Sequence, residues 1–297
     1  MSRVVAVLGP TASGKTETAI EIAANLGADV ISVDSMQVYR GMDVGTAKPT
    51  LLERKGITHH MIDVVDPEAE FTVAEYRRMG RRILDDAERP IVISGGSGLH
   101  FRALVDPMSF APTDPRLRSE LENTEPEELA AELLQTDPEA AAHVDMANSR
   151  RVLRALEIFR LTGETPTARA ASAEADELRR YVPEMEFTAI GLDPGELLDH
   201  RIDVRLRMMR SGGLVEEVQR LRGRLGRTAR RAVGYRQVLS YLAGEVTEEE
   251  AFEEAARKTK KLARRQRTWF QRDPRIRWIP WLDDAADRAH RALEAIG

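Results

Sequence analysis

The sequence predicts an α/β fold with a parallel-sheet core, an inserted all-helical domain and a helical C-terminal region. Short β-branched apolar runs alternate with helical patterns over the first hundred residues, which is typical of a parallel sheet. From 112 to 186 the pattern is helical and contains no strand-like run. A further apolar run at 187–192 predicts a return to the sheet. The expected parts are therefore 1–111, 112–186 and 187–297.

The composition indicates a folded protein whose charge is unevenly distributed. The chain has 297 residues, of which 42% are hydrophobic and 31% are charged, and it contains no cysteine. The absence of cysteine excludes disulfides and thiolate metal sites. The formal net charge is −5, yet residues 201–280 hold 21 Lys and Arg against 10 Asp and Glu. This local excess of positive charge favours a basic surface that binds a polyanion.

The sequence shows no feature of export or membrane insertion. Met1-Ser2-Arg3 leads directly into the first apolar run, which leaves no room for a signal peptide. No apolar run approaches the roughly 20 residues that a membrane-spanning helix needs. We therefore expect a cytoplasmic protein without membrane contact, and a monomer.

The first apolar run, Val4–Leu8, precedes a glycine-rich stretch that opens a helical pattern over 17–26. The stretch reads Gly9-Pro10-Thr11-Ala12-Ser13-Gly14-Lys15-Thr16. This order of strand, loop and helix is the P-loop, so the predicted core is P-loop NTPase-like. The loop amides and the helix N-terminus would hold phosphate, Lys15 would neutralise terminal oxygens, and the Thr16 hydroxyl would ligate Mg²⁺. A glycine-rich turn that binds nothing is the alternative, and the match at all eight positions disfavours it.

Two more predicted strands end in residues suited to a site. The run at 30–33 ends at Asp34, and the run at 90–94 ends in Gly95-Gly96-Ser97-Gly98-Leu99. In open parallel sheets, ligands bind beyond the carboxyl ends of the strands. We therefore expect Asp34 and this glycine turn to face the ligand of the P-loop.

Several capping patterns predict helix starts. Capping boxes are expected at Thr72 with Glu75, at Asp193 with Glu196, and at Thr247 with Glu250, and further helices are expected to begin near 124–127 and 148–149. The last long helix has an apolar stripe at helical spacing, formed by Phe252, Ala255, Thr259, Leu262, Gln266 and Trp269. Its other faces are basic, with no acidic residue from Arg257 to Arg272. Contact with a polyanion is favoured over a merely solvated face.

In combination these stretches resemble the tRNA dimethylallyltransferase family, also called tRNA isopentenylpyrophosphate transferases. The matching stretches run from the first strand to the last long helix. They are Gly9–Thr16, Ile31–Tyr39, Gly41–Pro49, Gly95–Leu99, Val233–Gln237 and Arg264–Trp269. The P-loop alone is widely shared, whereas Gly41–Pro49 and Val233–Gln237 are far more specific.

The resemblance implies transfer of a dimethylallyl group from dimethylallyl diphosphate to N6 of the adenosine 3′ of the anticodon. The P-loop would then hold the donor diphosphate, with Mg²⁺ between Thr16 and the diphosphate. Asp34 would act as general base, with an acid in the outer sphere of Mg²⁺ as the alternative role. The family usually has Thr where Ser97 stands, so the hydroxyl is retained, and Tyr where His100 stands, which puts the role of that phenol in doubt.

The resemblance also implies two sets of binding residues. Besides Gly9–Thr16, the donor diphosphate would meet Arg201 and Arg205, and catalysis would use Asp34, Ser97 and Lys15. The anticodon stem-loop of tRNA would meet Asp34, Ser35, Met36, Gln37, Ser97, Arg118, Arg150, Arg151, Arg154, Arg231, Gly234, Tyr235, Arg236, Arg264, Arg265, Gln266 and Arg267.

Three other functions fit parts of the sequence. A small-molecule or nucleotide kinase would explain the P-loop, and an adenylate isopentenyltransferase would share the donor, but neither needs the basic C-terminal third. An NTP-driven switch that binds nucleic acid would need a Walker B acid, and the strand at 90–94 ends in glycines instead.

Overall fold

The computed structural model describes residues 4–296, which divide into two compact units. One unit contains the chain up to Val105 and from Met185 onward, and the other is Asp106–Glu184. The second unit begins at Asp106 rather than at the expected 112 because the connecting segment bonds to its helices. Ser109 N–H donates to Glu174, and the carbonyl oxygens of Ala111 and Pro112 accept from Arg154. The predicted start of the chain at Met1-Ser2-Arg3 lies outside the described residues.

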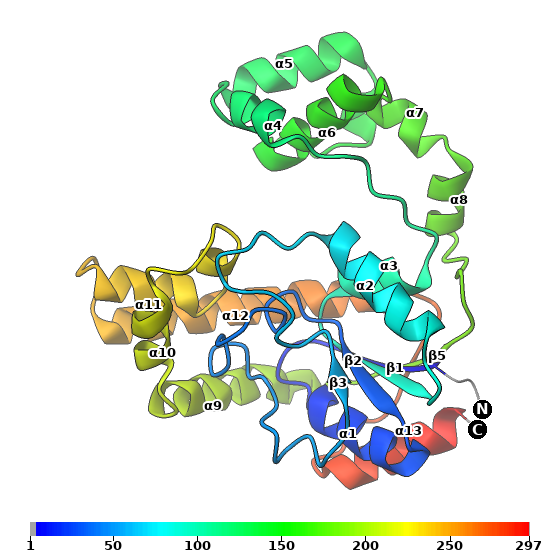
Figure 1. The fold of residues 1–297 in the computed structure, drawn as a ribbon, viewed down its shortest axis with the longest axis vertical. Helices are drawn as coiled ribbons and strands as arrows, with labels where there is room; N and C mark the ends of the chain where they lie inside the picture. The colour runs from blue at the N-terminus through cyan, green and yellow to red at the C-terminus, as the bar shows by residue number, and fades with distance from the viewer. Residues whose placement is uncertain (1–3, 297) are drawn as a thin grey trace. The chain divides into compact units, whose positions relative to one another are not determined.

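The first unit is built on a parallel sheet of six strands in the order β3-β2-β4-β1-β5-β6 (Figure 1). The strands are β1 Val4–Leu8, β2 Asp29–Ser32, β3 His59–His60, β4 Ile91–Gly95, β5 Thr188–Gly191 and β6 Ile276–Trp278. The runs at β1, β2, β4 and β5 were expected, whereas β3 and β6 are too short to stand out in the sequence. The predicted parallel core is confirmed.

Among residues 4–296, the first unit also contains eight α-helices: α1 Lys15–Leu26, α2 Val73–Asp85, α3 Gly98–Val105, α9 Leu198–Ser211, α10 Leu214–Leu221, α11 Tyr235–Leu242, α12 Glu248–Gln271 and α13 Ala285–Ile296. The second unit is helical, with α4 Pro115–Glu122, α5 Pro126–Thr136, α6 Ser149–Thr162, α7 Pro166–Ala170 and α8 Ala173–Arg179. Short 3₁₀ turns lie at Ala140–Ala142, Gly195–Leu197 and Ala229–Arg231.

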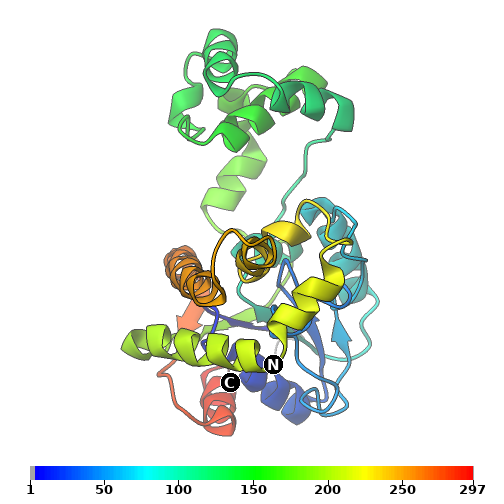
Figure 2. The same ribbon diagram turned by 90° about the vertical axis from the view of Figure 1, so that its left-hand side faces the viewer.

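Alternation along the strands places the core on both faces of the sheet. In β1, Ala6 and Leu8 pack into the cluster that contains Tyr76 of α2, while Val7 packs into the cluster formed with α1 and α13. Figures 1 and 2 show α1 and α13 side by side on one face, with α2 and α3 covering the other. The carboxyl ends of β1, β2 and β4 are thereby left to the loops that form the site.

Two of the three expected capping boxes are present, and the helices expected near 124–127 and 148–149 begin there without a side-chain cap. Thr72 and Thr247 form capping boxes with Glu75 and Glu250. The expected box at Asp193 with Glu196 is wrong: Asp193 accepts from Gly195 N–H, a 3₁₀ turn follows, and α9 begins at Leu198 without a side-chain cap. Asp193 instead pairs with an arginine of α12. Within residues 4–296, every helix is too short or too polar to cross a membrane.

Candidate active site

A cavity of about 1060 Å³ lies beside the phosphate loop, and we call it the P-loop cavity. Its lining includes Gly14, Lys15 and Thr16 from the start of α1, together with Arg201 and Arg205 from α9. Gly14 has a φ of 83°, which a side chain would oppose, and this conformation turns the chain into α1. The cavity therefore joins a helix N-terminus to three cationic side chains, an arrangement that suits a phosphate group.

Two hydroxyls of the loop lack protein partners. Ser13 Oγ is fully buried and makes no hydrogen bond to residues 4–296. A buried hydroxyl without a partner costs about 1–3 kcal/mol, so the loop carries an unmet hydrogen-bonding group directly behind the cavity lining. The Thr16 side chain lines the P-loop cavity and likewise makes no hydrogen bond within the described chain.

A divalent metal at this site would need oxygen atoms from a bound phosphate in addition to those of the protein. Among residues 4–296, no group of three or more His, Asp or Glu side chains could hold a metal ion. The Thr16 hydroxyl is a hard oxygen of the kind that Mg²⁺ prefers, and Mg²⁺ is commonly held by few protein atoms, waters and substrate phosphates. The residues therefore fit Mg²⁺ if a bound phosphate completes its coordination.

The cations of the P-loop cavity are held at an electrostatic cost. Lys15 Nζ donates to the carbonyl oxygen of Pro10 at 3.0 Å. Burial, with a further contribution from the positive charge of Arg205, lowers the pKa of Lys15 to about 8. Burial also lowers the pKa of Arg205, although the carboxylates of Asp34 and Glu17 oppose that shift. A bound polyanion would relieve both effects.

The C-terminal segment forms part of this cavity, which sequence reasoning missed. Trp281 Nε1 donates to the carbonyl oxygen of Ser13 at 2.8 Å, and the guanidinium of Arg201 lies 4.8 Å from the centre of the Trp281 ring. Arg288 of α13 is 1% exposed and donates to Thr18 and Glu17 at the start of α1. The back of the phosphate loop is therefore fixed by the last helix.

A second cavity of about 370 Å³ opens beyond the carboxyl ends of β2 and β4, and we call it the Asp34 cavity. Asp34, Ser35, Met36 and Ser97 contribute to its lining, as do Gly234, Leu262, Arg265, Gln266 and Trp269. Arg205 and Met209 line this cavity and the P-loop cavity alike. The two cavities therefore meet along α9.

The carboxylate of Asp34 is fixed at one oxygen and open at the other. Oδ1 accepts from the N–H of Met36 at 2.8 Å and from the N–H of Gln37 at 3.4 Å. Oδ2 makes no hydrogen bond within the part of the chain that the structure describes. Asp34 thus presents an oriented acceptor to the cavity.

The predicted apolar stripe of α12 serves two purposes. Phe252 and Ala255 are buried in the core, as expected. Thr259, Leu262, Gln266 and Trp269 are only partly buried and form a wall of the Asp34 cavity. Gln266 Oε1 accepts from the N–H of Thr11 at 2.8 Å, which ties α12 to the phosphate loop.

The glycines after β4 leave room for this wall. A Cβ on Gly98 would lie 2.1 Å from the Trp269 ring, and one on Gly96 would lie 2.6 Å from Gln266. The turn therefore allows the side chains of α12 to pack directly on the backbone beside Ser97.

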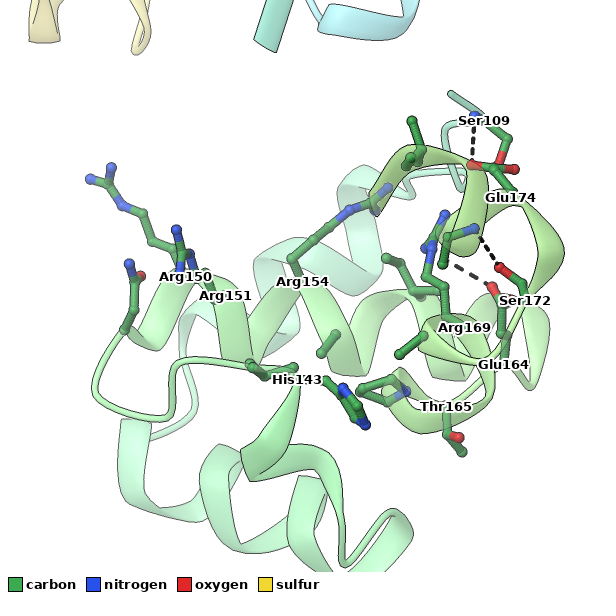
Figure 3. A pocket seen from close by; sticks show the side chains of 18 residues that line it. Ser109, His143, Arg150, Arg151, Arg154, Glu164, Thr165, Arg169, Ser172 and Glu174 are labelled. Atoms are coloured by element: carbon green, nitrogen blue, oxygen red, sulfur yellow. Dashed lines mark hydrogen bonds and ion pairs between the residues drawn. The ribbon is translucent and has the colours of Figure 1, made fainter. Parts of the chain in front are cut away.

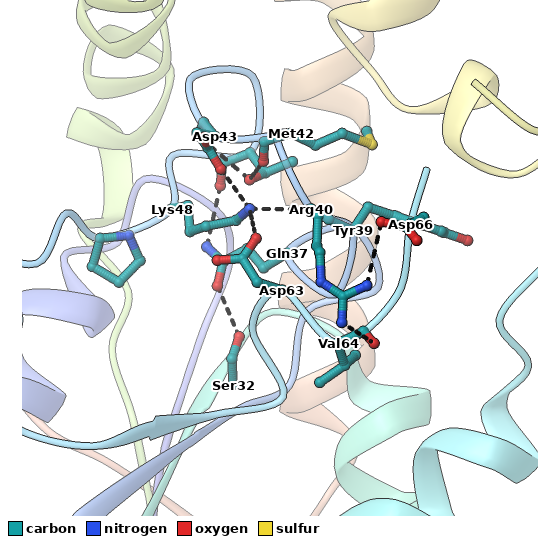
Figure 4. A network of polar contacts seen from close by, with 12 residues as sticks. Ser32, Gln37, Tyr39, Arg40, Met42, Asp43, Lys48, Asp63, Val64 and Asp66 are labelled. Atoms are coloured by element: carbon teal, nitrogen blue, oxygen red, sulfur yellow. Dashed lines mark hydrogen bonds and ion pairs between the residues drawn. The ribbon is translucent and has the colours of Figure 1, made fainter. Parts of the chain in front are cut away.

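The loop after β2 is held from one side by a buried lysine. Lys48 has a side chain that is 4% exposed, and its Nζ donates to Asp43 and to Asp63, both at 2.6 Å (Figure 4). Nζ also donates to the carbonyl oxygen of Tyr39. The ammonium group of Lys48 thus links three parts of this region, at Tyr39, Asp43 and Asp63.

Glu217 of α10 holds the same loop from the other side, and sequence reasoning gave no sign of it. The carboxylate is 2% exposed and accepts from the Tyr235 hydroxyl. It also accepts from three consecutive amides, those of Asp43 at 3.0 Å, Val44 at 2.8 Å and Gly45 at 3.0 Å. Because Gly45 and Thr46 line the Asp34 cavity, Glu217 fixes one of its walls.

Two residues expected to contact RNA have inward-facing side chains. Gln37 is 8% exposed, accepts from Ser32 and donates to the carbonyl oxygen of Thr46. Tyr235 is fully buried against Gly45 and bonded to Glu217. The polar groups of both side chains are therefore engaged in hydrogen bonds within the protein that shape the cavity. The neighbouring Arg231 and Arg236 are exposed and make no side-chain bond within the described residues.

The basic face of α12 is partly neutralised by acids of α9 and of the segment before it, although α12 itself has no acid from Arg257 onward. Three ion pairs connect the two segments, which run in opposite directions. They join Lys260 to Asp203 at 2.8 Å, Arg264 to Asp199 at 3.0 Å, and Arg267 to Asp193 at 2.6 Å. Arg265, by contrast, is exposed, lines the Asp34 cavity and has no ion pair within residues 4–296.

The arginines of the helical unit also differ in their availability. Arg118 and Arg154 both bond to Glu157, whose side chain is fully buried, so they neutralise an interior charge. Arg150 is exposed without an ion pair in the described chain, and Arg151 lies 3.8 Å from Asp145. Arg150, Arg151 and Arg154 line a cavity of about 780 Å³ (Figure 3), whereas Arg118 does not.

Comparisons with known proteins identify the family of the chain. The family model described as "IPP transferase" matches residues 37–273. The chain belongs to the IPP transferase family. Its relatives include the tRNA dimethylallyltransferase of Bifidobacterium longum, which is 45% identical over 95% of this chain and 87% of its own length. The tRNA dimethylallyltransferase of Thermobifida fusca is also 45% identical, over 100% of this chain and 95% of its own.

A solved structure extends the likeness to three dimensions. The tRNA isopentenylpyrophosphate transferase of Bacillus halodurans superimposes with a TM-score of 0.71 at 34% identity, over 99% of this chain and 95% of its own. The stretch matched by the IPP transferase model contains Glu217 and Arg265 but not the phosphate loop, Trp281 or Arg288. The predicted family and α/β fold are confirmed.

Proposed function

We propose that this chain transfers a dimethylallyl group from dimethylallyl diphosphate to N6 of the adenosine 3′ of the anticodon in tRNA, releasing diphosphate. The observation that carries the proposal is the meeting of two chemically different cavities at Arg205 and Met209. One cavity presents cations and the Thr16 hydroxyl to a polyphosphate, and the other presents the open carboxylate oxygen of Asp34. A cytoplasmic monomer is the form we propose.

The P-loop cavity would bind the donor diphosphate. Lys15, Arg201, Arg205 and the loop amides would stabilise the negative charge that grows on the leaving diphosphate as its bond to carbon breaks. Mg²⁺, held by Thr16 and the diphosphate, would supply charge neutralisation of the leaving group.

The Asp34 cavity would bind the acceptor adenosine. An exocyclic amine is scarcely acidic, so Asp34 would accept a hydrogen bond from N6–H first. It would then take the proton as nitrogen bonds to C1 of the donor. Since the adenosine must leave its stack to enter the cavity, a loop nucleotide is favoured over a paired one.

The reaction itself is tested with labelled substrates. We expect label to pass from dimethylallyl diphosphate to an anticodon stem-loop RNA in the presence of Mg²⁺, and not to AMP. Transfer to AMP would indicate an adenylate isopentenyltransferase. Transfer of the terminal phosphate from labelled ATP to an acceptor, without transfer of the prenyl label, would indicate a kinase.

Replacing Lys15 with alanine is expected to weaken donor binding and to leave RNA affinity nearly unchanged, because Lys15 lies in the P-loop cavity and not in the Asp34 cavity. Donor affinity should fall at least about tenfold, the scale of a lost charge-assisted hydrogen bond. Titration with dimethylallyl diphosphate and with the stem-loop measures both. Lys55→Ala is the matched control, because Lys55 lies at the same cavity but pairs with Glu21. An equal loss of RNA affinity would contradict separate sites.

Arg265 and Arg267 are expected to differ when each is replaced with alanine. Arg265→Ala should weaken RNA binding and lower the slope of log K against log salt by about 0.7 to 1, with the melting temperature unchanged. Arg267→Ala should also lower the melting temperature, because Arg267 holds Asp193 and the carbonyl oxygen of Gly195 ahead of α9. Binding across a salt series and thermal melts separate the two effects. An unchanged slope for Arg265→Ala would remove it from the RNA surface.

A further inference from the structure

His100 contacts the Asp34 cavity through another residue. It is the third residue of α3, it is 8% exposed, and it is not part of the cavity lining. Its Nδ1 lies 2.7 Å from Oγ of Ser97, which does line the cavity. The backbone of Ser97 is also fixed, since its N–H donates to the carbonyl oxygen of Val33 at 3.0 Å. The contact with His100 therefore bears on the direction of the Ser97 hydroxyl proton.

The imidazole ring of His100 is held in place on its other side. The Tyr76 ring lies edge-on to it, with the ring centres 4.5 Å apart at 88°. Tyr76 is fully buried, and its hydroxyl donates to the carbonyl oxygen of Ser32 at 2.8 Å. Packing and hydrogen bonds therefore connect β2 to Ser97 without a break, through Tyr76 and then His100.

The charge state of His100 limits what its bond to Ser97 can be. Burial lowers the pKa of His100 to about 4, so the ring is neutral near pH 7 and one of its nitrogens carries no proton. The separation of 2.7 Å is a hydrogen-bond distance for either polarity. With Nδ1 as the nitrogen that carries no proton, Nδ1 can only accept, and the Ser97 hydroxyl donates.

We propose that His100 is a positioning residue for the acceptor adenosine: by accepting the Ser97 hydroxyl proton, it turns the Ser97 lone pairs towards N6 in the Asp34 cavity. An adenine amine has two hydrogens. Asp34 Oδ2 takes one and Ser97 Oγ accepts a hydrogen bond from the other, so the amine lone pair is directed at the donor carbon. This inference rests on the proposed transfer to adenosine.

A double-mutant cycle tests the proposal. His100→Phe keeps the ring against Tyr76 but removes Nδ1, and it should lower the single-turnover transfer rate about 3- to 10-fold, the scale of one hydrogen bond. In the Ser97→Ala background the same change should lower the rate less than about twofold, because His100 then has no hydroxyl to orient. His100→Asn, whose Oδ1 can occupy the position of Nδ1, should retain more activity than His100→Phe. Donor affinity should be the same in every variant.

A spectroscopic measurement tests the polarity of the bond on its own. The ¹⁵N shift of His100 should show Nδ1 without a proton in the wild type. A protonated Nδ1 would overturn the orientation that we propose.

The outcomes separate the two levels of inference. Equal losses from His100→Phe with and without the Ser97 hydroxyl would mean that His100 acts only through packing, and the proposal would be wrong. If His100→Phe does not fold, as judged by circular dichroism, the cycle is run with His100→Leu, which also removes Nδ1 and should show the same dependence on the Ser97 hydroxyl. Failure of the wild type to transfer label to RNA would contradict the proposed function instead.

Discussion

Replacing Asp34 with asparagine is expected to lower the chemical step at least about 10²-fold, the scale of a lost general base. Asparagine keeps Oδ1, so the hydrogen bonds from the N–H groups of Met36 and Gln37 are retained and the turn after β2 is preserved. What is lost is the oxygen that faces the cavity without a partner and can take the amine proton. Single-turnover transfer with saturating donor and RNA measures this step.

The binding constants provide the control for this variant. RNA affinity should be close to that of the wild type. Donor affinity should be unchanged or tighter, because a negative charge near Lys15 and Arg205 has been removed. A transfer rate near the wild-type value would exclude Asp34 as the base. It would favour the alternative role as an acid in the outer sphere of Mg²⁺.

Replacing Glu217 with alanine is expected to lower the free energy of unfolding by about 3–5 kcal/mol. The change would leave three backbone N–H groups and the Tyr235 hydroxyl without their acceptor in a buried place. The loop that carries Gly45 and Thr46 would lose its fixed position, so transfer should fall as well. Urea denaturation of the whole chain measures the stability.

Glu216→Ala is the matched control for this second variant. Glu216 precedes Glu217 on α10 and is exposed, so its replacement should change stability by no more than about 0.5 kcal/mol. Similar losses for the two variants would mean that α10 itself, and not the carboxylate under the loop, determines the effect.

The local parts of the fold could be predicted because the signals for them are local. The strand, loop and helix around Gly14 follow from spacing, and the capping boxes at Thr72 and Thr247 satisfy amides only three residues away. The stripe of α12 also follows from its period. Period alone could not distinguish a core face from a cavity wall, because both require side chains that pack on one side.

The residues that sequence reasoning missed act across large separations in the chain. Glu217 meets Gly45 across 172 positions, and Arg288 meets Thr18 across 270. The residues next to Glu217 in the sequence do not indicate that its carboxylate accepts hydrogen bonds from three backbone amides. The same holds for Asp199 of α9 and Asp193 ahead of it, which pair with arginines that have no acidic neighbour within α12. The roles predicted for the site residues follow from the family resemblance and stay predictions.

The place of α13 against the phosphate loop has a consequence for folding. β1 lies in the middle of the sheet, between β4 and β5. The start of α1 is held by hydrogen bonds from Arg288 of the last helix. During synthesis the N-terminal segments emerge first, and contacts between distant segments form slowly. The helical unit from Asp106 to Glu184 can fold from segments that are close in the sequence. β1, by contrast, pairs with β5, which is synthesised much later. A nascent chain therefore contains its phosphate-binding sequence long before that sequence has a folded loop.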